Sequence, residues 1–175
     1  MLGRIEEAMS SYRDKGVRWT AKTLTSNVRD SQERRFGADF VGALDIDLPD
    51  YPTRKGFLAQ AKRVDPGDPF PASRYAELRD QCHRMLELSP DSYVFLYATT
   101  GIKVVPANAV VAAMPVNPHA LYSRGITSFF ELHFSSFVGD RGVSVPSIDV
   151  LEDLRTRFEA RSVLGLYASQ VEPTV

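Results

Sequence analysis

The stretch that most constrains the fold is GFLAQAKRVD, residues 56–65. Its first half is apolar, which is typical of a strand buried in a sheet. Gln60 and Lys62 follow on either side of Ala61, and they share one face because side chains alternate along a strand. Burying an amide beside an ammonium is unfavourable unless other groups satisfy both. The end of this strand therefore needs a polar partner.

The segment before it predicts where that partner comes from. Residues 38–48, ADFVGALDIDL, alternate partly between apolar and polar side chains and predict a strand. The loop PDYPTRKG follows, and its two prolines, aspartate and glycine predict a turn. We therefore expect residues 38–48 and 56–64 to pair as an antiparallel hairpin.

The register of this hairpin decides which acid meets the polar pair. With a turn centred near residues 50–51, Asp39 lies opposite Lys62 and diagonal to Gln60. Asp45 and Asp47 then lie near the turn, where water is their natural partner. A carboxylate, an amide and an ammonium are thus expected to meet far from the turn.

The other elements predict one α/β domain over residues 1–175. Apolar spacing and capping residues predict helices over 2–15, within 23–35, over 75–88 and over 148–160. Strands are predicted over 92–99 and 103–106, a short segment over 109–114, and either a strand or a helix over 129–138. This order favours helices around a single mixed sheet.

Composition restricts the class of protein. Hydrophobic residues make up 43% of the 175, which is sufficient for a core without disulfides or metals. The net charge of −1 excludes an overall positive field, so a nucleic-acid site requires a local basic patch. Cys82 is the single cysteine and is expected in the core. Without a signal-like N-terminus or an apolar run of membrane length, we expect a cytoplasmic protein.

The polar group at the hairpin suits metal-assisted hydrolysis of a phosphodiester. Mg²⁺ prefers oxygen ligands, which the Asp39 carboxylate, the Gln60 amide and the Ala61 carbonyl provide. Lys62 can orient the attacking water or offset negative charge in the transition state. Glu33, six residues before Asp39, is the candidate for a further acidic ligand or general base.

GADF, residues 37–40, followed by LAQAKR, residues 58–63, resembles the PD-(D/E)XK nuclease superfamily. The Gln-x-Lys form resembles its restriction-endonuclease-like branches, which cleave foreign or modified DNA. The resemblance implies an αβββαβ core and a nuclease that uses Mg²⁺, with Mn²⁺ as a substitute. It implies Asp39, Gln60 and Ala61 as metal ligands, and Glu33 and Lys62 as further catalytic residues. Gln60 stands where many members have an acid, which removes one charge from the site.

A basic patch is the predicted contact to the nucleic-acid backbone. Its members are Lys55, Arg63, Arg74, Arg79 and Arg84. A solvated helix face is the alternative for the arginines, and a simple cross-strand ion pair is the alternative for Asp39 and Lys62. For the whole chain, the alternatives are a catalytically weak nuclease-fold module that binds nucleic acid or protein, and an unrelated α/β domain. A homodimer or a partner protein is expected to supply target recognition.

Overall fold

The computed structural model describes residues 3, 6–7, 13–14, 16–25, 38–144, 147 and 150–171. Within these residues the chain forms one mixed sheet of eight strands, in the order β1-β2-β8-β3-β4-β5-β6-β7. The strands are β1 (Arg13–Asp14), β2 (Val17–Thr25), β3 (Phe40–Asp47), β4 (Thr53–Arg63), β5 (Ser92–Ala98), β6 (Gly101–Pro106), β7 (Arg124–Gly125) and β8 (Ser162–Gln170). The pairs β3–β8 and β4–β5 are parallel, and the other neighbours are antiparallel.

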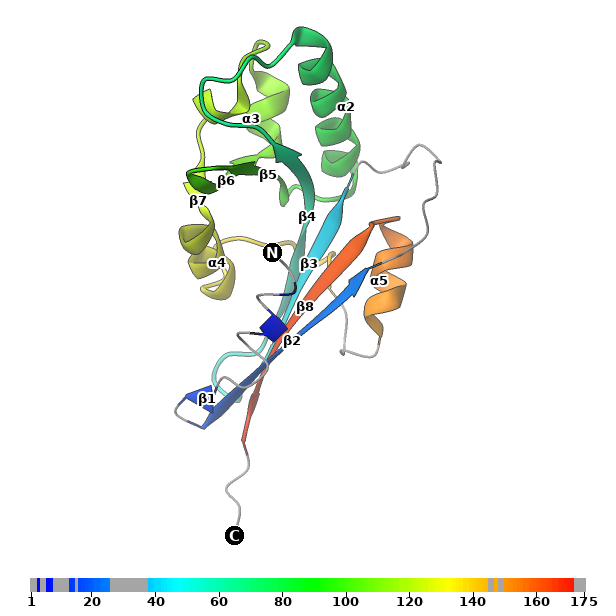
Figure 1. The fold of residues 1–175 in the computed structure, drawn as a ribbon. Coiled ribbons are helices and arrows are strands. Elements are labelled where there is room, and N and C mark those ends of the chain that lie inside the picture. Colours follow the sequence, from blue (N-terminus) through cyan, green and yellow to red (C-terminus); the bar gives the residue numbers. More distant parts are fainter. Residues whose placement is uncertain are drawn as a thin grey trace.

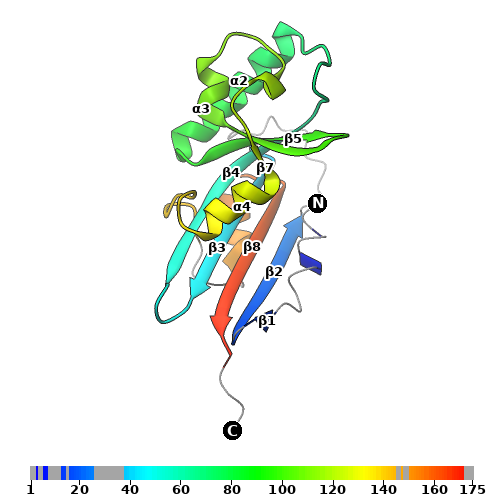
Figure 2. The ribbon, with the colours of Figure 1, turned by 90° about the vertical axis from the view of Figure 1, so that its left-hand side faces the viewer.

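Helices cover both faces of the sheet (Figure 1). They are α2 (Ala72–Leu88), α3 (Ala107–Ala112), α4 (Ile126–Phe134) and α5 (Leu151–Arg157), with a 3-10 turn at Pro118–Ala120. Buried residues of α2, α3 and α5 share one apolar cluster with Val41, Leu58 and Val94 of the sheet. On the opposite face, α4 packs its phenylalanines against Phe57 and Phe95. Figure 2 shows α4 crossing in front of β3 and β8.

Helix α2 is amphipathic and connects two parallel strands. Tyr75, Leu78, Cys82 and Met85 are buried, and the spacing of three or four residues places them on one side of the helix. The helix returns the chain from the end of β4 to the start of β5, as a parallel pair requires. The predictions of this helix, of the hairpin and of the strand after it are confirmed.

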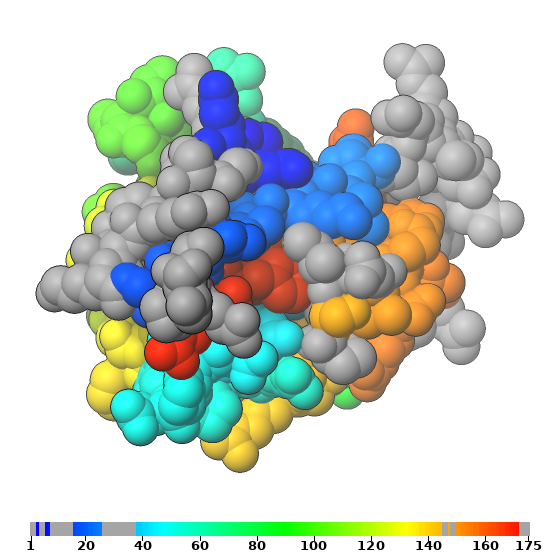
Figure 3. Space-filling model, turned by 90° about the horizontal axis from the view of Figure 1, so that it is seen from below, coloured from blue at the N-terminus to red at the C-terminus, as the bar shows by residue number. Residues whose placement is uncertain are grey.

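Strand β8 was not predicted, although it lies in the middle of the sheet. It is inserted between β2 and β3, and Figure 3 shows it between β2 and the β3–β4 hairpin. Val163, Leu164 and Leu166 are almost fully buried because helices cover both faces there. The short apolar run at the end of the chain therefore completes the core.

Other element predictions need correction. Of the segment 23–35, within which a helix was predicted, the structure describes only residues 23–25, which form the end of β2; the rest lies outside the described residues. Within the helix predicted over 2–15, Gly3, Glu6 and Glu7 are helical, whereas Arg13–Asp14 form β1. The ambiguous segment 129–138 begins as the end of α4 and continues as a turn.

The hairpin register also differs from the prediction. Phe40 pairs with Ala59 and Ile46 with Thr53, so the turn is centred one residue earlier than predicted. Asp39, directly before β3, consequently lies beside Gln60 and not opposite Lys62. Asp45, predicted to face water, is instead buried in β3.

Candidate active site

Asp39 is held at the junction of three strands. Its backbone N–H donates to the Ala59 carbonyl of β4 at 2.8 Å. Its carbonyl accepts hydrogen bonds from the backbone N–H groups of Arg161 and Ser162, at 3.1 and 3.2 Å, where β8 begins. Bonds to both neighbouring strands fix the backbone from which the carboxylate projects.

The Asp39 carboxylate contacts the polar end of β4. Its Oδ2 accepts a hydrogen bond from Gln60 Nε2 at 2.5 Å and another from the Ala61 backbone N–H at 3.0 Å. Gln60 is only 5% exposed, so this contact satisfies an amide that would otherwise be costly to bury. The predicted pairing of the two strands is therefore correct, and it brings the Asp39 carboxylate into contact with the Gln60 amide.

Lys62 lies on the same strand face, two residues further along β4. Its side chain is 18% exposed, and Nζ lies 3.8 Å from Oε1 of Glu77 on α2. Glu77 is thus an ion-pair partner of Lys62, and it comes from the helix above β4. A polar group of mixed charge thus lies where β4 passes under α2.

Glu77 is the residue that sequence reasoning missed. A helix that connects two parallel neighbouring strands packs back on the first of them, so α2 had to cross the Lys62 face of β4. Glu77 precedes the buried Leu78 and lies four residues before Gln81, whose Nε2 donates to Oε1 of Glu77 at 3.3 Å. Its position next to a buried residue of the helix, and four residues before Gln81, was the signal in the sequence that could have identified Glu77.

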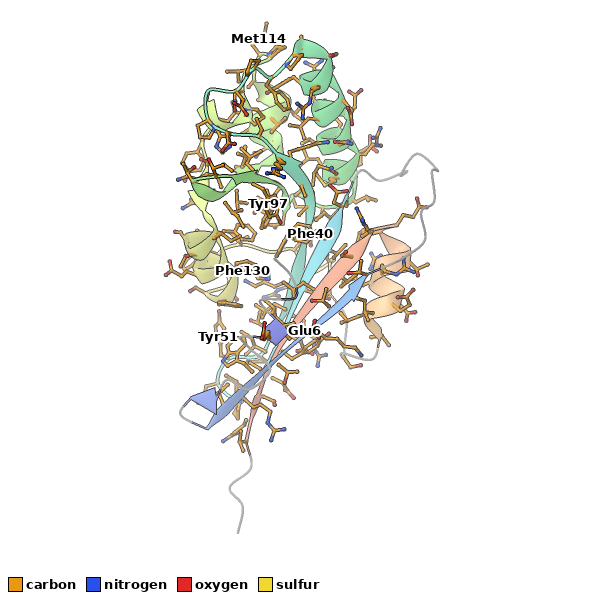
Figure 4. The ribbon with its side chains drawn as sticks, viewed as in Figure 1. Glu6, Phe40, Tyr51, Tyr97, Met114 and Phe130 are labelled. Atoms are coloured by element: carbon orange, nitrogen blue, oxygen red, sulfur yellow. The ribbon has the colours of Figure 1, made fainter. Side chains whose placement is uncertain are left out.

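Tyr97 is an aromatic neighbour of the Asp39 carboxylate. Figure 4 labels Tyr97 and Phe40, which lie near one another by the start of β3. Burial raises the pKa of the Tyr97 phenol, and the nearby Asp39 carboxylate raises it further. Tyr97 therefore stays a neutral neighbour of the site at physiological pH.

The predicted basic patch is only partly a surface feature. Arg63 and Arg74 are exposed, and the Arg74 guanidinium lies 4.9 Å from the centre of the Phe70 ring. Arg79 and Arg84 are half-buried, and Arg84 Nε has no hydrogen-bond partner among the described residues. Acidic residues alternate with these arginines along α2, namely Glu77, Asp80 and Glu87. The helix surface is therefore mixed in charge, and its contact to phosphate remains a prediction.

Lys55 lies away from this surface. It is 3% exposed on the α4 face of β4, and burial lowers the pKa of its ammonium to about 8 although Asp91 raises it. This burial contradicts the prediction that Lys55 contacts the nucleic-acid backbone. Glu33, the predicted extra acid, lies outside the described residues. Cys82 is fully buried, as predicted, and burial raises the pKa of its thiol to about 12.

The donor set fits a hard cation in part. No three His, Cys, Asp or Glu side chains come together within the part of the chain that the structure describes. Asp39 and Gln60 are nevertheless in contact, and a half-turn of the Gln60 amide exchanges its nitrogen for an oxygen ligand. Mg²⁺ commonly takes one or two carboxylates, with water and substrate phosphate completing its shell. These residues are compatible with such a site.

Comparison with known proteins gives no match to a family model, to a curated protein or to a solved structure. Among the described helices, none is both long and apolar enough to cross a bilayer.

Proposed function

We propose that this chain is a Mg²⁺-dependent nuclease that hydrolyses phosphodiester bonds, preferentially in DNA. The observation that carries the proposal is the contact between Asp39 and Gln60, with Lys62 next on the same face of β4. Two adjacent oxygen-bearing side chains and an ammonium match the needs of metal-assisted phosphoryl transfer.

Each residue has a distinct role in this proposal. The Asp39 carboxylate, the Gln60 amide oxygen and the Ala61 carbonyl hold the cation, with Glu33 as a further acid. When bound, the cation polarises the phosphoryl oxygen and lowers the pKa of water. Lys62 holds a phosphate oxygen and offsets the negative charge that develops in the transition state. The backbone hydrogen bonds that the Asp39 carbonyl accepts from Arg161 and Ser162 keep its carboxylate in position during the reaction.

The order of elements supports a restriction-endonuclease-like core as the finer fold assignment. The hairpin β3–β4 is followed by α2 and by β5, which runs parallel to β4, as the βαβ part of the resemblance implies. Strand β8 lies between β2 and β3 and interrupts the expected run of three sequential strands. The proposed assignment therefore requires β8 to be an additional strand that enters the sheet between two strands of the core.

Biological context comes from the resemblance alone. It suggests cleavage of foreign or modified DNA, with recognition provided by a second copy or by a partner protein.

A catalytically weak module that binds nucleic acid or protein is the second candidate. The observation in its favour is that Gln60 donates a hydrogen bond to Asp39, an arrangement that stabilises the carboxylate without a cation. The two candidates differ in whether divalent metal causes cleavage.

A matched pair of variants, one directly before β3 and one within it, tests the proposal. Supercoiled plasmid, linear DNA and RNA are incubated with the purified protein and Mg²⁺, Mn²⁺ or a chelator. Asp39→Asn keeps an acceptor for the Ala61 N–H but removes the charge, and cleavage should fall about a hundredfold or more. Asp45→Asn makes the same change at the aspartate that pairs with Arg54 at 3.1 Å, and cleavage should persist. Wild-type protein that binds DNA without cutting it in either metal supports the second candidate.

A further inference from the structure

Glu77 has two partners at one oxygen. Its Oε1 lies 3.8 Å from Lys62 Nζ and accepts a hydrogen bond from Gln81 Nε2 at 3.3 Å. The carboxylate comes from α2 and the ammonium from β4, so the contact joins the helix to the strand that carries the candidate site.

The contact between Lys62 and Glu77 is loose and asymmetric. At 3.8 Å it exceeds the distance of a hydrogen bond, so it is a charge attraction only. The Glu77 side chain is 65% exposed, whereas that of Lys62 is 18% exposed. The ammonium therefore lies beneath, and the carboxylate covers it from the solvent side. An exposed ion pair of this kind contributes at most about 1 kcal/mol, so another anion can displace it.

A phosphodiester is the anion that the neighbouring groups suit. Its oxygens carry one negative charge, as a carboxylate does, and form charge-assisted hydrogen bonds with lysine. Gln81 gives Glu77 a contact on α2 that does not depend on Lys62. Glu77 can therefore leave the ammonium and remain on the helix.

We propose that Glu77 occupies, in the free protein, the place beside Lys62 that a substrate phosphate takes, and that the phosphate displaces it. This inference rests on the proposed function, because it assigns Lys62 to the substrate. Glu77 is here a competitor for the ammonium and takes no part in the reaction.

Binding measured without divalent cation tests this directly. A short fluorescent DNA duplex is titrated with wild-type protein and with Glu77→Gln, which keeps the side-chain length and the contact to Gln81. Affinity should increase about two- to fivefold, the equivalent of removing a surface ion pair. Asp80→Asn removes the same charge from the same helix and should increase affinity less. In a Lys62→Met background, Glu77→Gln should have no effect.

Several results overturn the inference. If Glu77→Gln binds DNA as well as the wild type or more weakly, the inference is wrong. It is also wrong if Asp80→Asn increases the affinity equally, because that result indicates only long-range repulsion. The inference is likewise wrong if Glu77→Gln still increases the affinity in the Lys62→Met background, or if the wild-type protein does not bind DNA. With cleavage as the readout, KM should fall while kcat is constant, and a loss of kcat would place Glu77 in the reaction. DNA binding without cleavage refutes the proposed function but leaves this comparison intact.

Discussion

Strand β4 carries two lysines, seven residues apart, whose environments are opposite. Lys62 is partly exposed under α2 and faces Glu77. Lys55 is buried on the α4 side, and its Nζ has no hydrogen-bond partner among the described residues. An odd separation along a strand places two side chains on different faces, so one strand presents one cation outward and buries the other.

The environment of Lys55 is a partly buried polar cluster below α4. Oδ1 of Asp91 accepts hydrogen bonds from the Tyr93 hydroxyl at 2.8 Å and from the Gly139 N–H at 2.9 Å. His133 is fully buried, and its Nδ1 must donate to the Val138 carbonyl at 3.0 Å, because a carbonyl only accepts. His133 Nε2 has no partner within the described part of the chain. On one face of β4 a lysine charge is therefore accessible to a substrate, and on the other face a lysine charge lowers the stability of the fold.

The sharpest test exchanges each lysine for methionine. Lys62→Met should lower cleavage about a hundred- to a thousandfold, because a charge that stabilises the transition state is lost, with almost unchanged stability. Lys55→Met should raise the free energy of unfolding by about 1–3 kcal/mol, because it replaces a buried, unsatisfied charge with an apolar chain of similar length. Cleavage kinetics and urea denaturation at pH 7 measure the two effects. Destabilisation by Lys55→Met would show that the attraction to Asp91 outweighs the burial.

Alkaline pH provides the second test of the same contrast. Burial lowers the pKa of Lys55 from 10.5 to about 8. Between these values the unfolded chain holds the proton that the folded protein has lost, so stability rises with pH. Between pH 7 and 10 we expect a gain of about 2–3 kcal/mol that is present in the wild type and absent in Lys55→Met.

Urea denaturation of the wild type and of Lys55→Met at each pH measures this gain, as the change with pH of the difference between their midpoints. Measurements should stop at pH 10, because burial and Asp91 raise the pKa of Tyr93 and its ionisation in the unfolded chain then opposes the effect. A difference that does not change with pH would mean that Lys55 titrates normally and that water reaches its ammonium.

The sequence was sufficient for the elements whose partners lie nearby. The hairpin, α2 and β5 follow one another along the chain, and each has turn residues and periodic apolar positions that define it. Strand β8 pairs with β2 and β3, and its partner in β2 is about 145 residues away, so no local pattern indicates where it inserts.

The candidate site was predictable to the same extent. Period-two alternation was enough to place Gln60 and Lys62 on one face, and the hairpin brought Asp39 to Gln60. The one-residue shift of the turn changed its partner from Lys62 to Gln60. Lys55 was misassigned because the segment that buries it, after α4, lies more than 80 residues later. Burial by such distant segments is a tertiary property that a strand pattern does not encode.

Acid pH tests the buried side of the comparison through His133. Burial lowers the pKa of this histidine from 6.5 to about 4, with a smaller contribution from the Lys55 charge. Between these values the unfolded chain binds a proton that the folded protein excludes, so stability falls as pH decreases. Between pH 7 and 4.5 we expect a loss of about 2 kcal/mol from this residue. His133→Asn keeps a donor for the Val138 carbonyl but does not titrate, so it should lack this part of the loss. Thermal denaturation of both proteins across this range measures the difference, and identical pH profiles would show that His133 titrates in the folded protein as it does in the unfolded chain.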